Sequence, residues 1–312
     1  MQLNMKYNKI IEEIVTGGSD RRFYRIEKNK KTYILIEDKN IGDYVKILNH
    51  LIRAGIGVPQ LFEVKENQAV VEDLGSNTLY KLMQSGEKNW LALYRMAIVE
   101  LVKLQIDGFP GAPVNNYYDE EHIKWEQDYF KEFFIKQLYK IPDDEIKEID
   151  EDLKKLHREV SLRIKPISNF LMHRDYQSQN IFIKEGRVRI IDFQSARFGP
   201  FTYDLASLLR DAYVVIDKNE EKGLIEFYLK CLIRRGIKIT KRDFLEIYKL
   251  TAIQRNMQAL GAFANLSLNK GKVGFKKYIP NGLRLLKRGL KEGNYLNFLK
   301  LINETAKGLG QR

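Results

Sequence analysis

The 312-residue sequence predicts an α+β protein with two lobes, a small N-terminal lobe built on an antiparallel sheet and a larger, mostly helical C-terminal lobe. Its length exceeds the roughly 250–300 residues at which one hydrophobic core usually stops growing. Strand-like segments rich in β-branched and aromatic residues fall in the first 75 residues, whereas most of the remainder has the apolar spacing of helices. We expect lobes at residues 1–75 and 76–312.

The N-terminal lobe alternates short strands with one helix. YNKIIEEIV, RRFYRIEK and KTYILIED are separated by turn signals at Gly17-Gly18 and at Lys28-Asn29-Lys30. Apolar spacing over 43–54 predicts a helix, which Gly55 closes. A second hairpin follows at 61–64 and 69–72, and the polar run DLGSN then marks the junction between the lobes.

The C-terminal lobe is predicted to be helical except for one compact strand–loop–hairpin unit at 170–193. Thr240 followed by Asp243 resembles a helix cap. The expected helices cover residues 90–105, 121–141, 144–163, 203–215, 220–235, 240–265 and 281–289.

Composition limits the location and the partners. Cys231 is the only cysteine, so no internal disulfide can form, which fits a reducing compartment. The sequence has neither a secretory leader nor an apolar run long enough to span a membrane, so we expect a cytoplasmic protein. The net charge of +12 lies in the last third, where 222–312 contains 20 basic and 5 acidic residues. The basic segment 270–291 fits a solvated surface, an anionic substrate, nucleic acid or an anionic membrane.

The segment FLMHRDYQSQNIFIKEGRVRIIDFQSAR, residues 170–197, carries the predicted chemistry. Phosphoryl transfer needs an aligned nucleophile, neutralised phosphate charge and metal ions held by oxygen ligands. Asp175 could accept the proton of a substrate hydroxyl, and Asn180 and Asp192 could hold Mg²⁺. A hairpin between Asn180 and Asp192 would bring them together. The joint pattern H-R-D-x-x-x-x-N, hairpin, I-D-F is the catalytic-loop and metal-loop arrangement of protein kinases, which predicts a protein-kinase-like fold that uses ATP and Mg²⁺.

Further segments are candidates for contacts with the nucleotide or for support of the predicted catalytic loop. Gly17, Gly18 and Ser19 lie between two predicted strands, where free backbone amides could cover nucleotide phosphates. In the following strand, Arg21 and Arg25 would share one face. Glu72 to Leu74 end the small lobe, where backbone groups could contact an adenine edge. Asp204 is expected to brace the catalytic loop from a helix start.

These residues resemble the aminoglycoside phosphotransferase and choline kinase superfamily, whose members are small-molecule kinases. Within it, the chain is most similar to bacterial anomeric kinases of N-acetylmuramate and N-acetylglucosamine. The matching stretches include GGSDRRFYRI, VVEDLG, HRDYQSQNI and IDFQSARFGPFTYDLASLLRDAY. The resemblance implies that Asp175 is the catalytic base, that Asn180 and Asp192 bind Mg²⁺, and that Gly17 to Ser19 cover the phosphates of ATP.

One departure from protein kinases concerns the lysine of the third strand and its glutamate partner. Ile36 stands where the lysine is expected, and the only acid of the following helix is Asp43. The anomeric kinases, as the resemblance suggests, lack this lysine as well. Arg21, Arg25 and Lys39 are candidates for the cation that holds the phosphates.

Three functions stay open from the sequence. The first is a kinase that phosphorylates the anomeric hydroxyl of N-acetylmuramate, N-acetylglucosamine or a related sugar; the basic last third suits a substrate with a carboxylate. The second is an aminoglycoside or choline kinase, for which the acidic residues of 120–128 could form a cation-binding wall. The third is an inactive pseudokinase or a basic binding protein. We expect a small-molecule partner, no nucleic acid and no membrane, and the sequence leaves the oligomeric state open.

Overall fold

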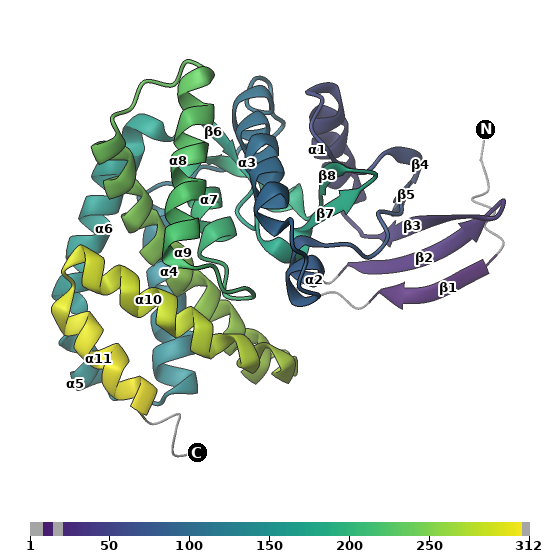
Figure 1. The fold of residues 1–312 in the computed structure, drawn as a ribbon. Helices are drawn as coiled ribbons and strands as arrows, with labels where there is room; N and C mark the ends of the chain where they lie inside the picture. The colour runs from purple at the N-terminus through teal and green to yellow at the C-terminus, as the bar shows by residue number, and fades with distance from the viewer. Residues whose placement is uncertain (1–8, 15–20, 308–312) are drawn as a thin grey trace. The chain divides into compact units, whose positions relative to one another are not determined.

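The computed structural model describes residues 9–14 and 21–307, which form two compact units. The first unit comprises residues up to Val114 together with Gln179–Ala196, and the second comprises Asn115–Ser178 and the chain from Arg197 onward (Figure 1). The first unit contains the whole predicted N-terminal lobe and adds two helices and the predicted hairpin to it.

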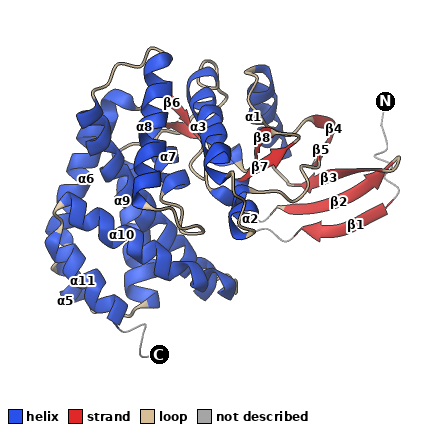
Figure 2. Ribbon diagram, in the orientation of Figure 1, coloured by secondary structure: helices blue, strands red, loops and turns tan. Residues whose placement is uncertain are grey.

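A five-stranded antiparallel sheet forms the base of the first unit, in the order β1-β2-β3-β5-β4 (Figure 2). Its strands are β1 (Lys9–Ile14), β2 (Arg22–Lys28), β3 (Lys31–Glu37), β4 (Leu61–Lys65) and β5 (Gln68–Glu72). Asn29 and Lys30 join β2 to β3 with φ values of 53° and 60°, as a tight two-residue hairpin turn requires. The antiparallel sheet and both N-terminal hairpins were predicted from the sequence and are confirmed.

Helices α1 (Ile41–Arg53), α2 (Leu79–Gln84) and α3 (Trp90–Asp107) complete the first unit with the hairpin of β7 (Ile181–Lys184) and β8 (Arg187–Ile190). Tyr44 of α1 stacks on Phe193 with ring centroids 5.2 Å apart. On β8, the amide of Ile190 donates to the Gly57 carbonyl at 2.7 Å. These contacts hold the residues on either side of Asp192.

The second unit consists mainly of helices around the buried helix α9 (Lys241–Leu268). Its two short strands, β6 (Phe170–Met172) and β9 (Arg197–Gly199), pair antiparallel. The helices are α4 (Glu120–Tyr129), a π-helical continuation (Phe130–Leu138), α5 (Asp143–Lys147), α6 (Asp150–Ile164), α7 (Phe201–Leu209), α8 (Lys218–Arg234), α10 (Ile279–Gly293) and α11 (Leu296–Lys307).

The structure corrects two of the predicted helices and adds one that was not predicted. The helix predicted over 144–163 is divided by a turn at Glu148 and Ile149, and Ile146 and Ile149 are both buried. The helix predicted to reach residue 215 ends at Leu209, where the Asp211 carboxylate binds the amide of Tyr213 instead. The last helix, α11, was not predicted.

One predicted helix cap is confirmed. The Thr240 hydroxyl accepts a hydrogen bond from the Asp243 amide at 3.1 Å, and this contact begins α9. Within the described residues, no helix is both long and apolar enough to cross a membrane.

Candidate active site

The predicted catalytic loop follows β6 and is bound by a buried carboxylate. Asp204, in the first turn of α7, accepts the amide of His173 at 2.7 Å and that of Arg174 at 2.9 Å. Arg174 has a φ of 76°, a left-handed conformation that costs a non-glycine residue roughly 1 kcal/mol or more. The two hydrogen bonds that the backbone amides donate to Asp204 hold the backbone in this conformation, which confirms the prediction that Asp204 braces the loop.

A second buried carboxylate holds the other end of the same loop. Asp211 accepts the Ser178 amide at 2.8 Å and the Ser178 hydroxyl at 2.6 Å. Burial raises the pKa of Asp211 above its usual value, and it raises the pKa of Asp204 to about 7. No role was predicted for Asp211 from the sequence. The feature that could have indicated one is its position, because it is a carboxylate seven residues after Asp204 and just beyond the end of α7.

Arg255 of α9 is the buried cation beside the predicted base. Its Nη2 lies 3.5 Å from Oδ1 of Asp175 and donates to Oε1 of Gln177 at 3.1 Å. Its Nε donates to the Ser207 hydroxyl at 2.7 Å, and that hydroxyl donates to the Arg174 carbonyl at 3.3 Å. Arg255 is thus linked to three positions of the catalytic loop. The sequence left its role undetermined.

Burial disfavours the charge of this guanidinium, but Tyr203, Asp175 and Asp211 together keep the pKa of Arg255 above its usual value. The Asp175 side chain is 34% exposed, whereas that of Arg255 is only 7% exposed. The candidate base is therefore open to solvent on one side and faces a fixed positive charge on the other.

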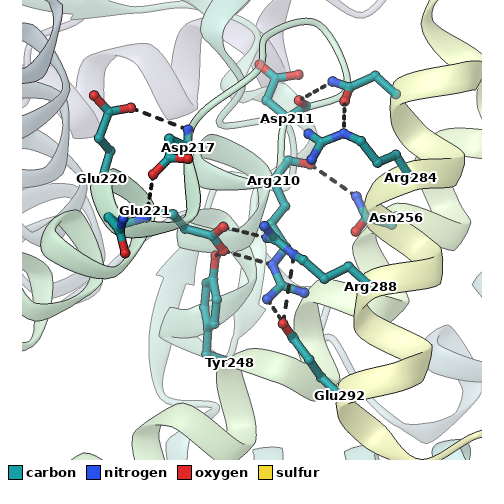
Figure 3. Close-up of polar contacts among 12 residues, drawn as sticks. Arg210, Asp211, Asp217, Glu220, Glu221, Tyr248, Asn256, Arg284, Arg288 and Glu292 are labelled. Carbon is teal, nitrogen blue, oxygen red and sulfur yellow. Dashed lines mark hydrogen bonds and ion pairs between the residues drawn. The ribbon is translucent and has the colours of Figure 1, made fainter.

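A buried ion network anchors the end of α7, directly before Asp211 (Figure 3). Arg210 donates from Nε to Glu221 of α8 at 2.9 Å and from Nη2 to Glu292 of α10 at 2.9 Å. Arg288 of α10 also binds Glu221, and the Tyr248 hydroxyl donates to Glu221 at 3.1 Å. Residues of three helices, α8, α9 and α10, thereby fix the position of Arg210, and through the chain they restrict Asp211.

In the first unit, the two predicted metal ligands lie next to each other. Nδ2 of Asn180 is 3.5 Å from Oδ2 of Asp192, and the Ile191 amide donates to the Asn180 carbonyl at 3.1 Å. Asp192 has a φ of 67°, in the left-handed region, and it also accepts a hydrogen bond from Gln194. The predicted hairpin does fold back and bring Asp192 to Asn180. The pair offers an amide oxygen and a carboxylate, which are hard ligands suited to Mg²⁺.

The two arginines predicted to bind nucleotide are paired with carboxylates. Arg21 binds Asp38, and Nε of Arg25 donates to Asp73 at 2.7 Å. Arg25 also binds Glu12. Gly17, Gly18 and Ser19 lie outside the described residues.

At the end of β5, the predicted hinge residues meet a lysine that sequence reasoning missed. Lys184 donates to the Glu72 carboxylate and to the Asp73 carbonyl, each at 2.8 Å, while Leu74 is buried. Ile36, at the position of the missing lysine, is a buried core residue of β3. Asp43 is exposed and pairs with Lys46 at 3.2 Å.

A sheet-based unit with an Asn–Asp pair and a helical unit with a braced His-Arg-Asp loop define a phosphotransferase of the kinase-like class. The model of the phosphotransferase enzyme family, APH, matches residues 10–236, which is more than half of the chain. The chain belongs to this family of enzymes, which transfer a phosphoryl group to an alcohol.

Similar curated proteins include an N-acetylmuramate/N-acetylglucosamine kinase of Neisseria meningitidis serogroup B, 28% identical over 86% of this chain and 82% of that protein. A protein of the same name from Pseudomonas aeruginosa is 25% identical over 88% of this chain and 82% of its own length.

Solved structures share the fold at low identity. A choline/ethanolamine kinase family protein from Mesorhizobium loti has a TM-score of 0.64 at 13% identity, with 96% of this chain and 94% of that chain covered. The gentamicin complex of APH(2")-IIa has a TM-score of 0.57 at 13% identity, with 90% of this chain and 92% of that chain covered. These likenesses confirm the predicted kinase-like fold.

Proposed function

We propose that the protein transfers the γ-phosphoryl group of Mg·ATP to the anomeric hydroxyl of N-acetylmuramate or N-acetylglucosamine. The observation that carries this proposal is the match to relatives named for these two sugars, which extends over 86% and 88% of the chain and therefore includes residues of both compact units. The fold alone is shared with kinases of very different substrates.

Asp175 is the proposed catalytic base. Its carboxylate is partly exposed, so an acceptor hydroxyl could reach it, and its loop is held at both ends by Asp204 and Asp211. An anomeric hydroxyl is more acidic than an ordinary alcohol, so a carboxylate base suffices. Holding the base and the acceptor oxygen in line contributes most of what the protein adds to such a transfer.

Asn180 and Asp192 are the proposed Mg²⁺ ligands, and residues 1–75 the proposed nucleotide-binding lobe. When bound, Mg²⁺ would neutralise phosphate charge. The Asn–Asp pair fits a metal because both side chains offer an oxygen ligand and the two side chains are neighbours, with Nδ2 of Asn180 3.5 Å from Oδ2 of Asp192. The nucleotide is proposed to contact Gly17, Gly18, Ser19, Arg21, Arg25, Glu72 and Leu74.

The observations favour an amino sugar over a cationic acceptor such as choline or an aminoglycoside. Glu126 was a candidate for an acidic wall, but its side chain is fully buried. Its oxygens accept hydrogen bonds from the hydroxyls of Tyr118 at 2.8 Å and Tyr203 at 2.7 Å. Asp128 forms an ion pair with Lys124. Glu126 is therefore not available to a cationic ligand, and the partly exposed Asp128 is already paired with a lysine.

The test is release of ADP in the presence of Mg·ATP and one acceptor at a time: N-acetylmuramate, N-acetylglucosamine, glucose, galactose, choline or kanamycin. We expect turnover with the two N-acetylated sugars and, by phosphorus NMR, a sugar 1-phosphate as product. Turnover with choline or kanamycin alone would refute the proposed acceptor. Binding of Mg·ATP without turnover of any acceptor would instead favour an inactive binding protein.

A further inference from the structure

Arg174 and Arg197 form a pair of like charges in the second unit. Arg197 is the first residue of β9 and pairs with Met172 of β6. Met172 in turn lies two residues before Arg174 in the chain. Both guanidinium groups interact electrostatically with the same buried side chains, namely Glu126, Tyr118 and Tyr203. Arg174 is adjacent in the chain to the proposed base, Asp175.

Each of the two arginines keeps a hydrogen-bond donor unused. Nε of Arg174 and Nε of Arg197 are both buried, and within the described part of the chain neither has an acceptor. Burial first, and then the neighbouring charge of Arg174, lower the pKa of Arg197 to about 10, so Arg197 still carries its charge at neutral pH. Buried donors are nearly always paired in folded proteins, so two unpaired donors on neighbouring cations indicate that a ligand belongs there.

Glu126 does not neutralise this pair. One of its oxygens accepts from the hydroxyl of Tyr118 and from Nε2 of Gln254, and the other accepts from the hydroxyl of Tyr203. Neither arginine forms an ion pair with a carboxylate of the described residues. Two guanidinium charges therefore share the single negative charge of Glu126, and positive charge remains.

We propose that Arg174 and Arg197 form a binding site for an oxyanion, either a carboxylate or a phosphate-like group. The planar fork of N–H donors on a guanidinium matches the paired oxygens of both kinds of group. Such a ligand would accept from the unused donors and reduce the repulsion between the two cations. Both side chains are partly exposed, so a ligand can enter from solvent.

Inorganic sulfate is the probe, and thermal unfolding of the full chain is the measurement. The ionic strength is kept constant with sodium chloride, because sulfate also stabilises proteins in general. We expect a saturable rise in the Tm of the wild-type protein. Loss of a charged donor in Arg197→Met should weaken sulfate affinity roughly 10- to 100-fold. Sulfate bound at other sites, such as a nucleotide site, would raise the Tm of the wild type and of Arg197→Met equally. That contribution cancels when the two proteins are compared.

Matched variants separate the site from the fold. Arg158→Met removes an exposed arginine of α6 in the same unit and should keep the wild-type response to sulfate. Without sulfate, Arg197→Met should be at least as stable as the wild type, because it removes one of two repelling charges. If this variant fails to fold, Arg197→Lys replaces it, since lysine keeps the charge but lacks the fork and should bind sulfate about ten-fold more weakly. An identical response to sulfate in the wild type and the Arg197 variant would overturn the proposal.

A kinetic measurement identifies the natural source of the oxyanion and rests on the proposed function. If Arg197→Met lowers kcat/KM for N-acetylmuramate and leaves that for N-acetylglucosamine unchanged, the site holds the carboxylate of the acceptor. If both sugars are affected alike and sulfate alters the rate of the wild type only, the site takes a free phosphate-like ion. Either result supports the site. The sulfate experiment requires no turnover, so failure of the proposed function would leave it unaffected.

Discussion

Replacing Asp211 by alanine should reduce turnover without removing any group proposed to touch the substrate. Asp211 accepts both the amide and the hydroxyl of Ser178, which lies between the proposed base Asp175 and the proposed metal ligand Asn180. It also accepts the amide of Tyr213 at 2.9 Å. In Asp211→Ala, three donors lose their acceptor in a buried place, and the loop loses its hold at Ser178.

The magnitude follows from these three hydrogen bonds. Each bond to a charged group contributes about 1.5–3 kcal/mol, but removal of Asp211 also relieves the cost of its own burial, so we expect a net loss of about 2–4 kcal/mol. For a chain of this size that corresponds to a fall in Tm of roughly 4–8 °C. A displacement of the loop by about 1 Å can lower kcat by about 100-fold.

The assay compares kcat at saturating Mg·ATP and acceptor with Tm for Asp211→Ala and Ser178→Ala. The serine variant keeps the amide bond to Asp211 and loses only the hydroxyl bond, so it should cost about 1 kcal/mol and reduce kcat much less. If Asp211→Ala lowers Tm as expected but keeps kcat within about two-fold of the wild type, Asp211 stabilises the fold and does not position the loop.

Four other outcomes are expected. Asp175→Ala should abolish turnover and leave ATP binding, measured by calorimetry, largely intact; undiminished turnover would exclude it as the base. Asp192→Ala should weaken the binding of ATP only when Mg²⁺ is present, and equal Mg·ATP affinity would contradict its role. Arg255→Met should lower kcat about 10- to 100-fold with little change in KM for ATP, with partial recovery in Arg255→Lys; a change in KM alone would argue against positioning of the base. Burial raises the pKa of Asp204 to about 7 from about 3.9 in the unfolded chain, so the folded protein holds a proton that the unfolded chain releases between these values. Its contribution to stability therefore falls as pH rises from about 4 to about 7, and urea unfolding of Asp204→Asn should lack that part of the slope.

Local sequence signals were sufficient for much of the fold. The Asn29-Lys30 turn, the Thr240 cap and the hairpin after Asn180 depend on neighbouring residues, and each is found as predicted. One boundary that failed depends on a distant contact, because α7 stops where Asp211 is drawn to Ser178, 33 residues earlier. The turn at Glu148 and Ile149, which divides the helix predicted over 144–163, has no Gly or Pro within it to signal it in the sequence.

The class of chemistry could be predicted from local sequence, because Asp175, Asn180 and Asp192 lie at the spacing of a kinase-like catalytic loop and metal loop. The charges that surround Asp175 and Arg174 depend on tertiary contacts. Arg255 reaches Asp175 from 80 residues away, and Arg197 joins Arg174 only because β9 pairs with β6. Contacts of this kind are made when packing brings distant segments together, and no periodicity or local motif in the chain encodes which partner each buried charge will meet.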